Sequence, residues 1–101
     1  MDNQHRKIAG YRELSQAEVD LMNAVKSLGI SLSVACDEVR SHLAAQAEQA
    51  ARLRSSDPTA AETELDRLTA AEPGRWVSIA RTHFQEGLMA LTRAVAQPGS
   101  F

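Results

Sequence analysis

Basic and aromatic side chains gather in "QHRKIAGYREL", residues 4–14, where the single tyrosine of the chain, Tyr11, stands between Lys7 and Arg12. Lys26 follows within the next predicted helix. A ring with cations around it can stack on a base and bind phosphates without reading base sequence. The same residues also fit a charged leader followed by a lysine whose stem lies along apolar surface. The pattern alone leaves both interpretations open.

Three arginines in the second half of the chain pose the same question. Arg75, Arg81 and Arg93 lie in "RWVSIARTHFQEGLMALTRAVA". Each one fits either a solvated helix surface or a second pocket for an anion.

Residues suited to catalysis or metal binding are scattered. His5, His42 and His83 lack the i, i+4 pairing and the nearby cysteines of a zinc site, so we expect them at the surface or at an interface. Cys36 lies beside an apolar stripe and is expected to be a buried, inert thiol. No glycine-rich phosphate loop and no Gly-x-Ser-x-Gly occur in the sequence. We therefore expect no enzyme, no metal and no cofactor.

Composition limits the class of protein. A chain of 101 residues with 44% hydrophobic content suits one small domain, and domains of this size are often helped by oligomerisation. The net charge of -2 provides no broad cationic field for DNA. We expect no secretory leader, since no charged region followed by an apolar run and a cleavage site is recognisable, and no run approaches the roughly 20 apolar residues that would span a bilayer. The expectation is a cytosolic, soluble protein without a membrane partner.

The first helix that must position Lys26 has a clear start signal. Ser15 and Glu18 form a Ser-x-x-Glu capping box, which predicts a helix over residues 15–54. Gly29 interrupts this helix at a cost of about 1 kcal/mol relative to alanine in isolation. A 3.5-residue repeat predicts that the helix packs along another one through Leu21, Val25, Leu28, Leu32, Ala35 and Val39.

The second half of the sequence predicts a turn region over residues 55–74 and a second long helix with its tail over residues 75–101. Asp57 can cap a short polar helix that starts at Pro58, and the chain should break or kink at 72–74. Pro98 must end the last helix, and Phe101 is either a frayed tail or a residue that docks on a neighbouring subunit. Trp76 and Phe84 are expected on the buried faces of helices. The fold class is therefore all-α: one antiparallel helical hairpin with a lead over 1–14, assembling into a homo-oligomer.

Both ends of the chain resemble one known family. "IAGYREL" and "MALTRAVAQP", in this order in a short chain, are similar to the phage anti-CBASS sponges, small proteins that sequester the cyclic oligonucleotide messengers of bacterial CBASS immunity. The middle, roughly residues 45–72, resembles the variable hairpin region of that family. Related anti-Thoeris sponges share the helical-hairpin domain.

The resemblance implies a function and a site. It implies helical hairpins that pair head to tail, assemble as hexamers and hold cyclic dinucleotides such as 3',3'-cGAMP between paired subunits in the infected host cell. The stacking tyrosine of the family matches Tyr11 and its phosphate-binding lysine matches Lys26. Arg75 is the best match for an arginine of a separate cyclic-trinucleotide pocket. The alternatives are a helical scaffold or adaptor without a ligand and a phosphodiesterase-like enzyme.

Overall fold

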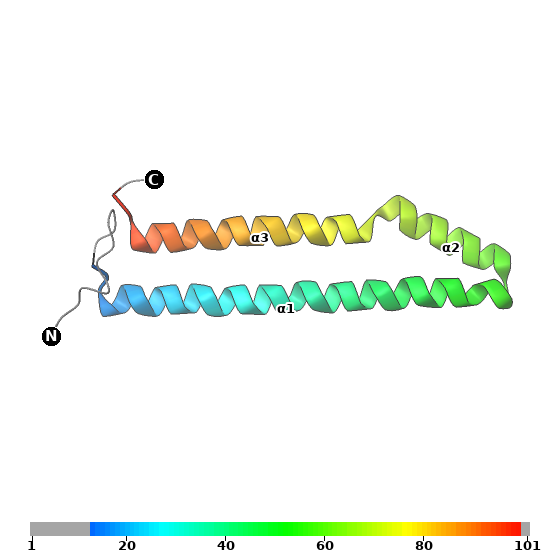
Figure 1. Ribbon diagram of the computed structural model, residues 1–101, viewed down its shortest axis with the longest axis horizontal. Coiled ribbons are helices and arrows are strands. Elements are labelled where there is room, and N and C mark those ends of the chain that lie inside the picture. The colour runs from blue at the N-terminus through cyan, green and yellow to red at the C-terminus, as the bar shows by residue number, and fades with distance from the viewer. Residues whose placement is uncertain (1–12, 100–101) are drawn as a thin grey trace. The chain divides into compact units, whose positions relative to one another are not determined.

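The computed structural model describes residues 13–99, and every regular element within that range is a helix (Figure 1). The elements are α1 (Gln16–Arg52), the 3-10 turn η2 (Leu53–Ser55), α2 (Pro58–Ala71) and α3 (Pro73–Ala96). The prediction of an all-α chain is confirmed for these residues. The two long helices expected from the sequence are α1 and α3.

The capping box predicted at the start of α1 is formed. The Ser15 amide donates a hydrogen bond to Glu18 Oε1 at 2.9 Å, and the Glu18 amide donates to Ser15 Oγ at 3.2 Å. Two backbone amides that have no partner within the helix are thereby satisfied. This local motif fixes the first turn of the helix that carries Lys26.

The predicted cap of α2 and the predicted break between α2 and α3 are both present, and the break is confined to one residue. Asp57 caps α2 by accepting a hydrogen bond from the Ala60 amide at 3.1 Å. Glu72 takes a left-handed conformation with φ 49° and separates α2 from α3. α3 starts at Pro73, two residues earlier than predicted, because proline fits the first turn of a helix, where its missing amide is not needed.

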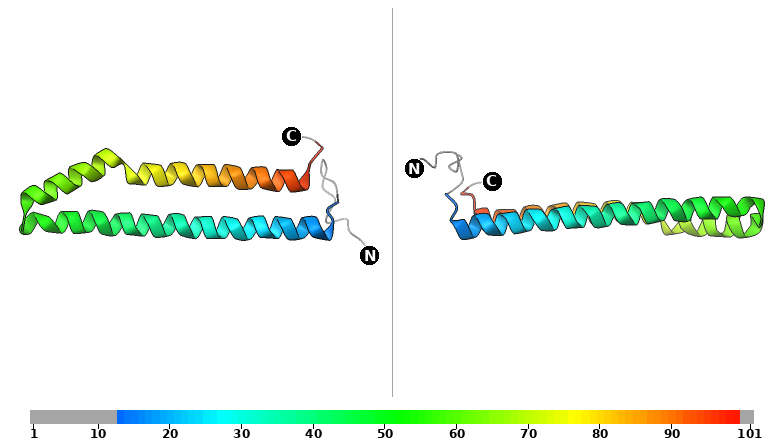
Figure 2. Two further views of the ribbon diagram at one scale, coloured as in Figure 1. Left: turned by 180° about the vertical axis from the view of Figure 1, so that it is seen from behind. Right: turned by 90° about the horizontal axis from the view of Figure 1, so that it is seen from below.

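Two compact units make up the chain: Met1–Ser31 with His83–Phe101, and Leu32–Thr82. In the first unit, the start of α1 and the end of α3 lie side by side and run in opposite directions (Figure 2). A Cβ atom at Gly29 would lie 3.1 Å from Leu88 Cδ1, which is tighter than an ordinary contact. The glycine that weakens the isolated helix therefore makes room for a leucine of α3.

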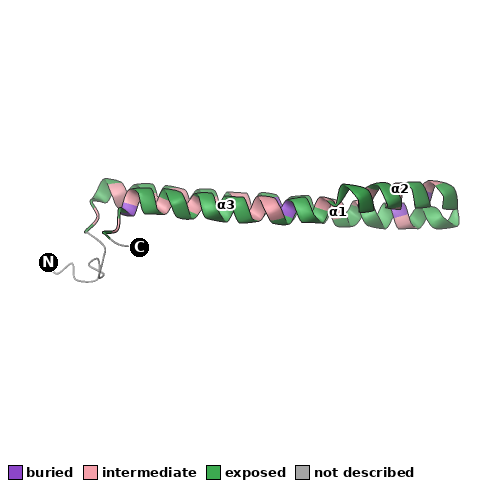
Figure 3. Cartoon of the chain, turned by 90° about the horizontal axis from the view of Figure 1, so that it is seen from above, coloured by how far each residue is buried: buried purple, intermediate pink, exposed green. Residues whose placement is uncertain are grey.

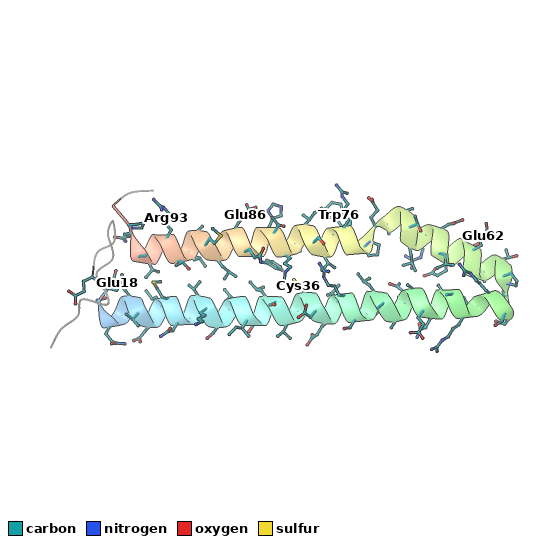
Figure 4. The ribbon with its side chains drawn as sticks, viewed as in Figure 1. Glu18, Cys36, Glu62, Trp76, Glu86 and Arg93 are labelled. Carbon is teal, nitrogen blue, oxygen red and sulfur yellow. The ribbon has the colours of Figure 1, made fainter. Side chains whose placement is uncertain are left out.

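The second unit contains the rest of α1, all of α2 and the start of α3. Arg40 Nη2 of α1 donates a hydrogen bond to Ser78 Oγ of α3 at 3.2 Å. Cys36 is 5% exposed and its side chain lies between these two helices (Figure 4), so the prediction of a buried thiol is confirmed. Antiparallel pairing of the two long helices is thus present within each unit.

The position of the packed face of α1 corrects the sequence prediction. Val25 and Leu32 are half-buried as expected, whereas Leu21, Leu28 and Val39 are 55%, 47% and 47% exposed, and Ala35 is also exposed. The face turned toward the rest of the chain instead carries Met22, Val25, Gly29, Leu32 and Cys36. Because Gly29 and Cys36 are small, this face allows α3 to approach more closely than the line of leucines would.

The burial predicted for two aromatic residues is also corrected. Trp76 is 58% exposed, so its predicted place in a core is wrong, and Phe84 is 38% exposed. Among the described residues, those that are buried are Cys36, Ala50, Ala61, Val77 and Ala96. In the view of Figure 3, buried surface appears only as small separate patches. Residues 13–99 by themselves therefore cover little of their apolar surface.

One segment, Gln16–Ser55, is long and apolar enough to cross a membrane by composition alone, with a mean hydropathy of 1.3 in its most apolar window. The core helix of a soluble protein satisfies the same criterion. A single such helix is weak support for a membrane protein.

Candidate functional site

Two of the five predicted site residues belong to the described part of the chain. Lys26 lies on α1 in the first unit and Arg75 on α3 in the second. Lys7, Tyr11 and Arg12 lie outside the described residues, so their predicted roles stay predictions.

Lys26 occupies the exposed edge of α1 that the sequence predicted. The preceding residue, Val25, is half-buried, while Lys26 is exposed and lies one turn before the close contact at Gly29. Among the described residues, no carboxylate forms an ion pair with Lys26. The described carboxylates therefore leave its ammonium group open to an anion.

Arg75 has a different environment, in the first turn of α3. Its Nη1 atom lies 3.5 Å from Glu72 Oε2, and its guanidinium carbon lies 5.5 Å from the centroid of the Trp76 ring. Both residues of the ion pair are more than half exposed. Arg75 is thus a partly neutralised cation next to an exposed aromatic ring.

Other charged pairs on the helices are ordinary surface interactions. Arg67 Nε donates a hydrogen bond to Glu64 Oε2 at 3.0 Å, and Arg52 pairs with Glu48 one turn away. The hydrogen bond lowers the pKa of Glu64 and raises that of Arg67, since each charged form is stabilised by its partner. Exposed pairs of this kind contribute little to stability.

The first unit contains an open groove of about 500 Å³ on the last turns of α3, here called the α3 groove. Its polar lining residues are Thr92 and Arg93, and the Thr92 hydroxyl donates a hydrogen bond to the Leu88 carbonyl oxygen at 2.9 Å. Its apolar lining residues are Leu88, Met89, Ala90, Ala96 and Pro98. The groove therefore combines an apolar surface with a guanidinium group.

Sequence analysis weighed Arg93 but missed the groove. Two signals could have indicated it. Met89 is an apolar residue outside the predicted packed face of the second long helix, and Pro98 ends that helix close by. The Gln97 amide donates to the Arg93 carbonyl oxygen at 2.8 Å, and Gln97 has φ 48°, so the chain turns out of the helix at this point.

Lys26 lies level with the α3 groove along the helix pair. Gly29 of α1 faces Leu88 of α3, and the two helices are antiparallel. Lys26 comes three residues before Gly29, so the residue opposite it on α3 comes three or four residues after Leu88, near Thr92. Consider a residue on each of two antiparallel helices that points at the other helix. On both helices, the residue four positions later is rotated toward the same side of the helix pair. Lys26 follows half-buried Met22 by four, and Thr92 follows Leu88 by four. Lys26 and Thr92 therefore lie at one level of the helix pair, whereas Arg93 lies on the side of α3 turned away from α1 (Figure 4).

This arrangement suits an occupant with an apolar, flat part and a negative charge. Apolar grooves of about 300–1,000 Å³ with a few polar groups are typical of small-molecule sites. Within residues 13–99, no group of three histidine, cysteine, aspartate or glutamate side chains is placed to hold a metal ion.

Comparison with known proteins gives matches over most of the chain. A family model described as "Acb2/Tad1, hairpin domain" matches residues 4–96. A relative from Pseudomonas phage JBD67, Anti-CBASS protein 2, is 49% identical over 107 aligned positions, which cover 97% of this chain and 97% of the relative. The family match spans all five predicted site residues.

Proposed function

Since the chain belongs to the Acb2/Tad1 hairpin-domain family, we propose that it is a phage immune-evasion protein that sequesters cyclic oligonucleotide messengers and thereby blocks CBASS defence in the infected cell. The observation that carries this proposal is the 49% identity to Anti-CBASS protein 2 over nearly the whole of both chains. A relative that matches this chain over nearly the whole length of both supports the same role for this chain. The site of action is the cytoplasm of the host bacterium.

In the proposed complex, Tyr11 stacks on a base and Lys26 binds a phosphate of a cyclic dinucleotide such as 3',3'-cGAMP. Lys7 and Arg12 supply further cations. Exposed Lys26, without an ion pair among the described residues, supports this role. Nanomolar affinity requires about -12 kcal/mol, and two stacked bases contribute roughly 2–6 kcal/mol. The phosphates must therefore supply charge-assisted contacts.

The proposed site is shared between two copies of the chain. A cyclic dinucleotide has approximate twofold symmetry, and an isologous dimer offers Tyr11 and Lys26 twice, once for each half of the ligand. Exposed leucines in the first unit, Leu21 and Leu28 on α1 and Leu91 on α3, support the covering of an apolar face by another copy. The proposed assembly is a hexamer built from dimers.

A second ligand class, the cyclic trinucleotides, is proposed for a separate pocket at Arg75. The exposed Trp76 ring beside the Arg75 guanidinium supports this, since bases stack on such rings and phosphates pair with such cations. The contact between Arg75 and Glu72 would have to open for a phosphate to bind.

The proposal is tested by incubating the protein with 3',3'-cGAMP, removing free ligand by filtration and denaturing the retained protein. Recovery of intact ligand, identified by mass spectrometry, is the expected result. Linear product would instead identify a phosphodiesterase. No retention of any cyclic nucleotide would favour a helical scaffold or adaptor, the alternative that the exposed apolar side chains also fit.

A further inference from the structure

We propose that Arg40, Ser78 and Arg81 form a further anion site, which binds free phosphate or the terminal phosphate of a small molecule. All three residues belong to the second unit, so this site is separate from the dinucleotide site proposed in the first unit. From the sequence, Arg81 fits either a solvated helix surface or a pocket for an anion. The site described here goes beyond the proposed function, since it requires no cyclic nucleotide.

One hydrogen bond fixes the position of the Arg40 side chain. Arg40 Nη2 of α1 donates to Ser78 Oγ of α3 at 3.2 Å, so the guanidinium group reaches across to the neighbouring helix. Arg81 follows Ser78 by three residues. Residues three apart are neighbours on a helix surface, separated by about 4.5 Å along the axis. The Arg40 guanidinium therefore lies within one turn of Arg81.

Both arginines lie on the same side of the helix pair. Cys36 of α1 and Val77 of α3 are buried, with 5% and 7% of their surface exposed, and Cys36 points toward α3 (Figure 4). Arg40 follows Cys36 by four residues. Arg81 follows Val77 by four residues, so both arginines are rotated from the buried faces toward one side. Two guanidinium groups and one hydroxyl group converge there.

The charges of this cluster are unbalanced. Arg81 is half-buried, and among the described residues neither Arg81 nor Arg40 forms an ion pair. Asp37, three residues before Arg40, is exposed and pairs with neither arginine. Two neighbouring cations without a counter-ion repel each other, so an anion between them would stabilise both.

The hydrogen-bond donors favour a phosphate with several free oxygens. A guanidinium group donates two parallel hydrogen bonds to phosphate oxygens. The Ser78 hydroxyl accepts from Arg40 and can donate its own hydrogen to a further oxygen. A terminal phosphate presents three acceptor oxygens and a charge of about -1.5 to -2 at pH 7. A phosphodiester has fewer free oxygens and a single charge, so it matches two guanidinium groups less well.

Side-chain NMR of the arginines in the full-length protein tests the site. The Nε–Hε signals are followed while methyl phosphate, a monoester, is titrated at neutral pH and constant ionic strength. We expect saturable shifts of the Arg40 and Arg81 signals. Dimethyl phosphate, the matched diester, should shift them much less. Arg67, an exposed arginine of the same unit that pairs with Glu64, is the internal control and should not shift.

Three variants in the same titration separate the site from a chance pair of surface arginines. Arg81→Gln should weaken methyl phosphate binding, read at the Arg40 signal, about 10- to 100-fold, because a charge-assisted contact is lost. Asp37→Asn should tighten binding, because a negative charge near the anion is removed. Arg67→Gln is the matched control and should bind like the wild type. Circular dichroism checks that all variants keep their helix content.

Inorganic phosphate and AMP, titrated in place of methyl phosphate, distinguish the two sources of the anion. Equal affinity for both would assign the site to free phosphate. Tighter binding of AMP that Arg81→Gln removes would assign it to the terminal phosphate of a nucleotide.

The site is overturned if the shifts do not saturate, if Arg67 shifts as much as Arg81, or if dimethyl phosphate acts like the monoester. Unchanged affinity of Arg81→Gln would overturn it as well. None of these outcomes involves 3',3'-cGAMP, so failure here leaves the proposed function untouched.

Discussion

On α1, the proposed site has one phosphate-binding group, the ammonium group of Lys26. Lys26→Ala should lose about 1.5–3 kcal/mol of binding free energy for each equivalent position, because a charge-assisted contact is removed. Lys26→Arg should retain part of the affinity, since the charge remains but the planar fork is larger. Lys26→Glu should be worse than alanine, because it places an anion against the phosphates. Calorimetry with 3',3'-cGAMP measures this order, and light scattering checks that the mass is unchanged.

If the wild type and the three variants at position 26 all bound the ligand with equal affinity, Lys26 would be only a solvated helix residue. The structure is consistent with an external anion at this position, because Lys26 is exposed and the described carboxylates do not pair with it.

Tyr11 provides an independent prediction at the same scale. Tyr11→Ala should weaken cyclic dinucleotide binding by roughly 1–3 kcal/mol for each equivalent position, whereas Tyr11→Phe should keep most of the affinity because the stacking ring is retained. Both variants should keep the oligomeric mass of the wild type in light scattering. Unchanged binding by the alanine variant in the same calorimetric assay would remove Tyr11 from the site.

At the scale of the elements, the junction between α2 and α3 is strained at one residue. Glu72 has φ 49°, in the left-handed region that disfavours residues with a Cβ atom. Glu72→Gly should raise the free energy of unfolding by up to about 1 kcal/mol, because glycine is the preferred residue at such a helix end. Losing the exposed contact with Arg75 should offset little of this gain. Urea denaturation measures the difference.

A control for the Glu72 prediction lies within α2. Glu62→Gly, at an exposed position of the same helix, should lower the stability by about 1 kcal/mol, because glycine weakens a helix interior. If both glycine variants were destabilised alike, the left-handed conformation at Glu72 would carry no strain.

At the scale of the whole molecule, α1 has one apolar face that packs within the chain and another that is exposed. Leu28→Glu should reduce the oligomeric mass with little change in helix content, because Leu28 is 47% exposed. Leu32→Glu should also lower the melting temperature, because a charge would then enter the half-buried face. Light scattering and thermal circular dichroism separate the two effects.

Exposed Glu48 is the control for this pair, and Glu48→Gln should change neither mass nor melting temperature appreciably. Binding of 3',3'-cGAMP should fall together with the oligomer in Leu28→Glu. A monomeric variant that still bound the dinucleotide tightly would show that the site is not shared between copies.

The sequence by itself determined the starts of α1 and α2 and the break before α3, although α3 begins at Pro73 and not at residue 75 as predicted. The capping box at Ser15, the cap at Asp57 and the break before Pro73 are all present. Each depends on bonds between residues three or four positions apart, or on the fixed backbone angle of proline, so local chemistry suffices to predict it. The sequence also placed Lys26 at an exposed edge and Cys36 in a buried position.

Only the tertiary structure decided which face of α1 packs and where the groove lies. Apolar residues occupy more than one side of α1, so periodicity alone could not distinguish the line through Leu21 and Leu28 from the line through Met22 and Gly29. The distinction depends on the fit of Leu88 over Gly29, a contact between residues far apart in the chain. The level of Lys26 relative to Thr92 follows from the same contact, because the register of two helices is fixed by how their side chains interlock and not by the spacing within either one.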